Sequence, residues 1–194
     1  MPLCRLLLAS ALWFAWVAAP VAAADNPAYV TDVRLTRGAA QDLVLAFRVV
    51  QAMDQRVLDT LESGLAVRFT YWVRVQSPRQ LLPDENLVDL RLERVLEKDN
   101  LKDRYHLTLS QDRPPRDVAN LSEALALMSR VEGVSLLPLE VLETRRPLYL
   151  RVRARLQRFE MPFRLHYVLP FVSYLDVGTD WYSLELPAPA AVQP

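Results

Sequence analysis

The chain of 194 residues has one cysteine, four glycines and two histidines, and these shortages exclude several kinds of site. Cys4 precedes an apolar run near the start, so the rest of the chain has no thiol for a disulfide, a thiolate metal site or cysteine catalysis. Four glycines cannot supply the backbone cradle of a nucleotide site. The motifs G-x-S-x-G and S-x-x-K and a Gly-rich phosphate loop are also missing from the sequence. We therefore predict no cofactor.

The histidines and the charge balance argue against metal and nucleic-acid binding. His106 and His166 are isolated from each other, whereas a metal site usually takes three or four ligands. We predict no metal site and no enzymatic activity; a hydrolase would require His106 within hydrogen-bond reach of a serine and a carboxylate in a cleft. Lysine plus arginine and aspartate plus glutamate both number 23, so the formal net charge is zero. A nucleic-acid binder would carry a basic excess, and we predict no such partner.

The N-terminal segment has the order of features of a secretory signal peptide. Arg5 precedes an apolar run over 6–19, Pro20 breaks it, and the small residues of 22–24 follow. The run is shorter than the roughly 20 apolar residues that span a bilayer, although an uncleaved anchor is the alternative. We expect residues 1–24 to be cleaved and the chain to be exported, to the periplasm of a Gram-negative bacterium. No later apolar run approaches spanning length, so no transmembrane span is expected after cleavage.

Residues 25–187 are expected to form a single domain, followed by a disordered tail over 188–194. Alternating apolar and polar residues predict strands at 29–36, 43–50, 65–76, 86–99, 104–112, within 145–162 and at 180–186. Two short helices are predicted, one from the N-cap Asp54 to Gly64 and one from the N-cap Asn120 to Gly133. About seven antiparallel strands with two covering helices indicate an α+β domain that is mainly antiparallel β and sandwich-like.

An arginine ladder is the first candidate binding feature. Arg151, Arg153 and Arg155 lie at alternating positions with apolar residues between them, so a strand would present all three on one face. One interpretation is a solvated face whose charges are offset by Asp89 or Glu93 on the polar side of another strand. The other is a surface for an anionic lipid head group or an acidic partner, because the planar guanidinium pairs bidentately with phosphate and carboxylate.

Aromatic residues form the second candidate feature. They are dense between Phe159 and Tyr182, where they could cover the end of the core, line an apolar pocket or form a docking surface. Trp181 belongs to this stretch, and Trp72 lies on the polar side of the strand predicted over 65–76. Both are candidate aromatic anchors for a partner.

Three segments together resemble a family of uncharacterised exported bacterial proteins, the domain of unknown function 4390 (DUF4390). They are VLDTLESGLAVRFTYWVRVQSPR, then KDRYHLTLSQD followed by NLSEALALMSR, and LYLRVRARLQRFEMPFRL followed by TDWYSLEL. Met161 and Pro162 stand where the family often has Leu-Pro. The resemblance implies a one-domain envelope protein with no assigned activity and no catalytic residues to transfer. It also implies an accessory role in signalling, since members are often encoded near a sensor histidine kinase.

We therefore expect a non-catalytic periplasmic protein that binds an envelope protein, such as the sensor domain of a membrane kinase. Arg151, Arg153 and Arg155 would provide the charge complementarity, with Trp72 or Trp181 as the anchor. The alternative is a carrier or sensor of an apolar, lipid-like ligand held between the sheet and the helices.

Overall fold

The computed structural model describes residues 27–109, 114–145, 147–158 and 177–192. The strands are β1 (Tyr29–Arg37), β2 (Asp42–Val50), β3 (Val67–Ser77), β4 (Glu85–Asp99), β5 (Arg104–Thr108), β6 (Arg116–Val118), β7 (Arg130–Pro138), β8 (Tyr149–Arg158), β9 (Val177–Gly178) and β10 (Tyr182–Glu185). The helices are α1 (Gln55–Glu62), α2 (Leu121–Ser129), α3 (Leu139–Thr144) and the short 3-10 turn η3 (Pro189–Ala191). None of the helices in these ranges is long and apolar enough to cross a bilayer. The predicted signal peptide, His166 and most of the aromatic stretch lie outside the described residues.

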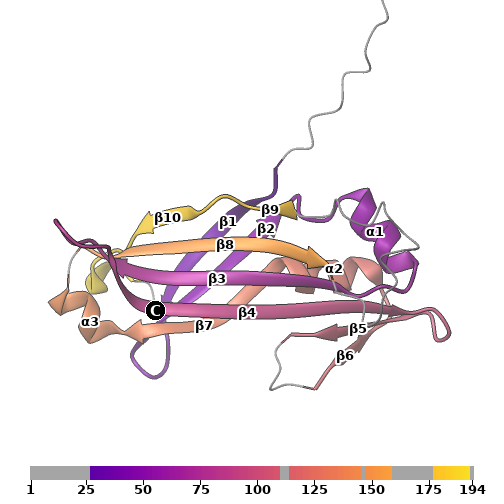
Figure 1. Cartoon of the computed structure of the whole chain (residues 1–194). Helices are drawn as coiled ribbons and strands as arrows, with labels where there is room; N and C mark the ends of the chain where they lie inside the picture. The colour runs from indigo at the N-terminus through magenta and orange to yellow at the C-terminus, as the bar shows by residue number, and fades with distance from the viewer. Residues whose placement is uncertain (1–26, 110–113, 146, 159–176, 193–194) are drawn as a thin grey trace, which may run out of the picture.

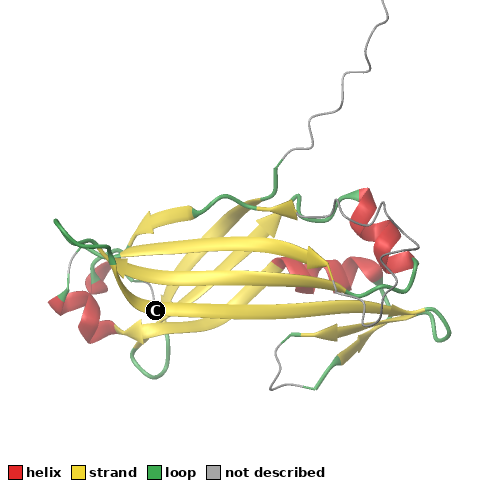
Figure 2. Ribbon diagram, viewed as in Figure 1, coloured by secondary structure: helices red, strands yellow, loops and turns green. Residues whose placement is uncertain are grey.

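Two antiparallel sheets face each other (Figures 1 and 2). The larger sheet has the strand order β10-β8-β3-β4-β5-β6, with β9 also paired to β8, and the smaller has the order β1-β2-β7. The strands of the smaller sheet cross those of the larger one obliquely, and α1 and α3 lie at opposite ends of the pair (Figure 1). The predicted α+β class, mainly antiparallel and sandwich-like, is confirmed.

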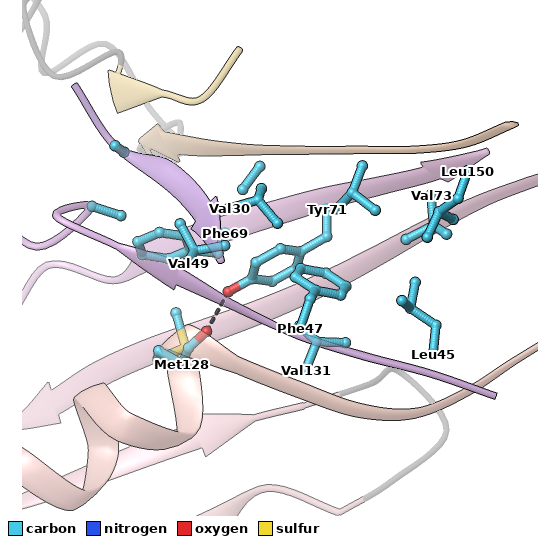
Figure 3. Packing of buried hydrophobic residues seen from close by; sticks show 14 of the residues in the cluster. Val30, Leu45, Phe47, Val49, Phe69, Tyr71, Val73, Met128, Val131 and Leu150 are labelled. Carbon is cyan, nitrogen blue, oxygen red and sulfur yellow. Dashed lines mark hydrogen bonds between the residues drawn. The ribbon is translucent and has the colours of Figure 1, made fainter. Parts of the chain in front are cut away.

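The core lies between the sheets and is built from the alternating apolar residues of β2, β3 and β8. Its largest fully buried side chains include Phe47, Phe69, Tyr71, Leu43, Leu45 and Leu150. Tyr71 meets Phe47 edge to face with ring centroids 5.8 Å apart and stacks on Phe69 at 6.1 Å (Figure 3). Each fully buried large apolar side chain stabilises the fold by about 1.5–3 kcal/mol, so these central strands hold the sheets together.

Helix α1 begins and ends as its sequence predicts. The carboxylate of Asp54 accepts a hydrogen bond from the backbone N–H of Val57 at 3.0 Å. Val57 and Leu61 are the buried residues of the helix. Gly64 follows the helix with φ +78°, a left-handed conformation that favours glycine, so the chain can turn from α1 into β3.

Helix α2 is shorter than predicted. It begins as expected, with the Asn120 side chain accepting from the N–H of Ser122 at 2.9 Å, but it ends at Ser129 rather than at Gly133. Residues 130–138 instead form β7, which pairs with the edge of β2 that β1 leaves free. Gly133, at φ +71°, therefore lies inside a strand. The helix ends before the residue that the local sequence predicts, for two reasons. The edge of β2 offers hydrogen-bond partners to residues 130–138, and Val131 becomes buried when they pair with it.

The C-terminal segment, which we expected to be a disordered tail, instead packs on the domain as far as Val192. The turn η3 contacts α3, and Val192 is 7% exposed. The sequence of this C-terminal segment shows no apolar periodicity, so no local pattern predicts that it packs. It packs against α3, a helix that the sequence patterns also do not predict. Strands β6 and β9 are likewise absent from the prediction, because strands of three and two residues leave little periodic signal.

Candidate functional site

The outer surface of the larger sheet brings together the residues predicted to bind a partner. We call it the arginine–tryptophan face and define it by the following outward side chains of β3, β4 and β8 and the segment before β10: Arg68, Trp72, Arg74, Asp89, Arg91, Glu93, Arg151, Arg153, Arg155 and Trp181. In β8 the intervening Leu150, Val152 and Ala154 are 0%, 0% and 2% exposed. The predicted alternation of the arginine ladder is therefore confirmed.

Trp72 lies in the middle of this face, between two arginines. It is directly opposite Arg153 of β8 on one side and Arg91 of β4 on the other. The guanidinium of Arg91 lies 6.0 Å from the centroid of the Trp72 ring, within the range of a cation–π contact. Trp72 therefore contacts an arginine of β4 and is the cross-strand neighbour of an arginine of β8.

Trp181 reaches the same face from just before β10. The guanidinium groups of Arg74 and Arg153 lie 5.2 and 5.9 Å from its ring centroid. The Trp181 side chain is still 38% exposed, so its ring contacts two arginines and keeps surface available to solvent. The two candidate anchors, Trp72 and Trp181, thus share Arg153 as a neighbour.

The acids expected to offset the ladder are paired elsewhere, which corrects one prediction. Strand β3 lies between β4 and β8, so neither Asp89 nor Glu93 is opposite the ladder. Asp89 pairs with Arg74 of β3 at 3.1 Å. Glu93 pairs with the two other outward arginines of β3 and β4, Arg68 at 3.2 Å and Arg91 at 2.6 Å. The β4 carboxylates therefore neutralise β3 and β4 rather than β8.

The ladder itself has a positive neighbour. Arg151 lies directly opposite Arg74, and its acidic contact is Asp84, at 3.9 Å between Nη2 and Oδ2. Within the described residues no carboxylate pairs with Arg153, whose Nε is buried without a hydrogen-bond partner. Like charges directly opposite each other are unfavourable, so this part of the face is suited to receive an anionic group.

A second polar cluster surrounds His106 on β5. Its Nδ1 lies 2.6 Å from Oδ1 of Asp117 and its Nε2 lies 3.5 Å from Oδ2 of Asp99. The hydrogen bond to Asp117, followed by the one to Asp99, raises the pKa of His106 above its usual value of 6.5. Its side-chain partners are these two carboxylates, and the described ranges contain no group of three residues able to hold a metal ion. The cluster joins β4, β5 and β6.

A small hollow lies on the outer surface of the smaller sheet. It has a volume of about 100 Å³ and is lined by residues of β1, β2 and β7. Both carboxylates of its lining pair with arginines, Asp32 with Arg48 and Glu132 with Arg130, each at 3.6 Å. Most of the charge in the hollow is therefore already paired.

Arg94 is an inward-facing arginine that the sequence patterns did not single out. It lies in phase with Leu92 and Leu96, on the apolar side of β4, and this position in the alternation is the signal that could have revealed it. Its guanidinium donates to the backbone carbonyls of Leu127 and Arg130, at the end of α2. Burial lowers the pKa of Arg94 from its usual range, so hydrogen bonds to the helix end compensate a desolvated cation.

Comparison with known proteins gives one match. A family model described as "Domain of unknown function (DUF4390)" matches residues 25–185 of the chain, in agreement with the resemblance found from the sequence segments. No curated protein and no solved structure matches the chain.

Proposed function

Because this chain belongs to the DUF4390 family, a domain of unknown function, we propose its role from its surface. It is a non-catalytic protein of the bacterial envelope that binds an acidic surface of a partner protein through the arginine–tryptophan face. The sensor domain of a membrane kinase is the specific partner class that we put forward.

The observation that carries this proposal is the position of Arg153. It has a tryptophan on either side, Trp72 on β3 and Trp181 before β10, and no carboxylate partner among the described residues. Its strand neighbour Arg151 faces Arg74, another cation. A partner carboxylate placed over Arg153 would add negative charge to this cationic part of the face and form charge-assisted hydrogen bonds.

The tryptophans add the second property expected of a binding face. Trp and Arg are the residue types most enriched among those that dominate interface energies, and here they contact each other in the free protein. Arginines held against the Trp72 and Trp181 rings are already ordered to some degree before a partner arrives. Less side-chain entropy is then lost on binding.

The envelope location rests on the N-terminal residues. The order of charge, apolar run, proline and small residues over 5–24 is typical of an export signal, and this pattern supports the proposed location. An exported chain meets the external parts of membrane proteins, which is the setting that a sensor-domain partner requires.

The alternative, an apolar-ligand carrier, has less support. The space between β2 and β3 is filled by Phe47, Phe69 and Tyr71, whose rings contact each other (Figure 3). A carrier needs an apolar cavity of a few hundred Å³. The filled interior at this position favours a function on the surface.

The test is a cross-linking pull-down of the tagged chain from its own envelope, comparing wild type with the triple variant Arg151→Glu, Arg153→Glu and Arg155→Glu. The matched control reverses the exposed arginines Arg34, Arg37 and Arg104, which lie on β1 and β5 and carry the same total charge. We expect one membrane protein to be captured by the wild type and the control but lost with the ladder variant, and its capture to weaken with added salt.

Equal capture by the ladder variant would contradict the proposal. If the wild type binds vesicles of anionic phospholipid and captures no protein, the ligand of this face is a lipid head group and not an acidic protein. Co-purification of extractable lipid without either result would favour the carrier. Thermal unfolding of each variant is the control for folding. We expect the melting temperatures to stay close to that of the wild type, because exposed ion pairs contribute little to stability.

A further inference from the structure

Strand β4 has an open edge along most of its length. β5 pairs with β4 only from Val95 to Asp99, and β3 pairs with its other side. Among the described strands none pairs with the outer edge of β4 from Glu85 to Arg94. The backbone N–H and C=O groups along this edge are thus available to another strand.

The other sheet edges are interrupted. β1 has a register shift at Asp32, which adopts φ 51°, and β7 has two register shifts against β2 and contains Gly133 at φ +71°. β6 and β10 are short, with three and four residues. Bulges and short strands are the usual protections of a sheet edge, and β4 has neither over Val88 to Leu96, where its pairing with β3 is regular.

The side chains along the open edge are also incompletely covered. Val88, Leu90 and Leu92 point inward and pack against the core, yet they remain partly exposed. Asp89 and Arg91 point outward and are exposed. A strand added here would complete the burial of the apolar residues and place its own alternate residues beside the charged ones.

We propose that the strand added to this edge is β4 of a second copy of the chain. The segment Val88-Asp89-Leu90-Arg91-Leu92 is self-complementary in an antiparallel pair centred on Leu90. Leu90 then lies opposite Leu90 of the second copy, Val88 opposite Leu92, and Asp89 opposite Arg91. Each inward pair is apolar, and each outward pair is a carboxylate with a guanidinium.

Neighbouring registers on the same strand are worse matched. Pairing centred on Arg91 would place that arginine opposite itself and Asp89 opposite Glu93. Pairing centred on Leu92 would place Arg91 opposite Glu93, which is favourable, but would put the apolar Leu90 opposite Arg94. Charged and apolar pairs taken together therefore favour the register centred on Leu90.

The ends of the open edge favour the same register. Pairing centred on Leu90 and kept to the regular part of β4 runs from Val88 to Leu92 in both copies. It stops short of the register shift between Asn86 and Val88 and of Val95, where Thr108 of β5 occupies the edge. Such a pair forms about four to six backbone hydrogen bonds. Since outward residues pair with outward residues, both arginine–tryptophan faces would lie on the same side of one continuous sheet. A partner with two acidic sites would then be bound bivalently.

Charge exchange tests the register. We measure the dimer dissociation constant of the full chain by analytical ultracentrifugation for wild type, Asp89→Arg, Arg91→Asp and the double variant. Each single variant puts like charges opposite each other and should raise the constant about tenfold or more, whereas the double variant restores opposite charges and should recover dimerisation. Arg74→Gln is the control for the lost Arg74–Asp89 ion pair and should leave dimerisation unchanged.

A disulfide gives a second, independent measurement in a Cys4→Ser background. Leu90→Cys places two thiols opposite each other with Cβ atoms about 4.5–5.5 Å apart, so oxidation should yield a covalent dimer. Leu92→Cys is the matched control, because its two copies would be displaced by four residues, or about 13 Å. Neither measurement involves the acidic partner. The proposal of dimerisation and the proposal of partner binding are therefore tested separately.

A wild-type chain that stays monomeric up to about 100 µM, well above a micromolar dissociation constant, would overturn the proposal. So would a dimer that both single reversals leave intact, or oxidation of Leu92→Cys as readily as Leu90→Cys. A monomer that instead captures an extended segment of another protein at β4 would show that the edge is open but serves a different partner.

Discussion

The hydroxyl of Tyr71, in the middle of β3, donates a hydrogen bond to the backbone carbonyl of Met128 in the last turn of α2 (Figure 3). The tyrosine is fully buried, and burial raises the pKa of its hydroxyl above the usual 10, so the group stays a donor at physiological pH. The guanidinium of Arg94 lies 5.7 Å from the Tyr71 ring centroid and donates to two further carbonyls at the same helix end. Together these groups hold α2 against the larger sheet.

Tyr71→Phe tests the first of these contacts. The substitution keeps the ring packing against Phe47 and leaves the buried Met128 carbonyl without its donor, which should lower the free energy of unfolding by about 1–3 kcal/mol. Urea denaturation measures the change. Tyr105→Phe is the control, because its hydroxyl is 3.4 Å from the Glu62 carboxylate at a more solvated site, and we expect a change within about 0.5 kcal/mol. Equal effects of the two substitutions would contradict the assigned role of the Tyr71 hydroxyl.

Arg94→Met tests the second contact. The methionine fills much of the same space, but the carbonyls of Leu127 and Arg130 lose a charged donor, so we expect a loss of about 1.5–3 kcal/mol. Hydrogen exchange should show faster exchange in α2 than in β3, since the helix end is released first. Arg104→Met, on an exposed position of β5, is the control and should leave both readouts unchanged. Uniformly faster exchange in both elements would indicate global destabilisation instead.

Asp117→Asn tests the His106 cluster. The Asp117 carboxylate is the main cause of the raised pKa of His106, so the variant should bring this pKa down towards 6.5. A folded-state pKa raised above the unfolded value contributes stability that is fully present below pH about 6.5 and is lost as the pH rises through the folded value. The wild type should therefore exceed the variant in stability at pH 5.5 more than at pH 8.5.

NMR titration of the imidazole signals, assigned with His166→Gln, measures the pKa directly, and urea denaturation at both pH values measures the linkage. An unchanged His106 pKa in Asp117→Asn would show that the hydrogen bond does not govern its protonation.

Trp181→Ala tests the aromatic part of the arginine–tryptophan face. Removing the ring takes away the surface against which Arg74 and Arg153 lie, so the affinity for the captured partner should fall about tenfold or more. Tyr29→Ala is the matched control, because Tyr29 is 49% exposed on β1 of the other sheet and should leave affinity unchanged. Calorimetric titration with the partner gives both values, and equal losses would remove Trp181 from the binding face.

Several features of this protein follow from the sequence alone because they depend on neighbouring residues in the chain. The alternation in β8 shows that Arg151, Arg153 and Arg155 share a face whatever strand lies beside them. The Asp54 cap likewise sets the start of α1 through a bond to a residue three positions on. These local rules were sufficient to predict the fold class and the arginines that β8 contributes to the arginine–tryptophan face.

Tertiary structure decided which strands are neighbours, and with them the chemistry of the face. The insertion of β3 between β4 and β8 separates Asp89 and Glu93 from the ladder and puts Arg74 there instead. The edge of β2 draws residues 130–133, predicted as the end of a helix, into the start of β7, and the segment before β10 brings Trp181 to Arg153. Strand pairing joins residues distant in sequence and is selected by burial of whole faces, so no local pattern specifies it.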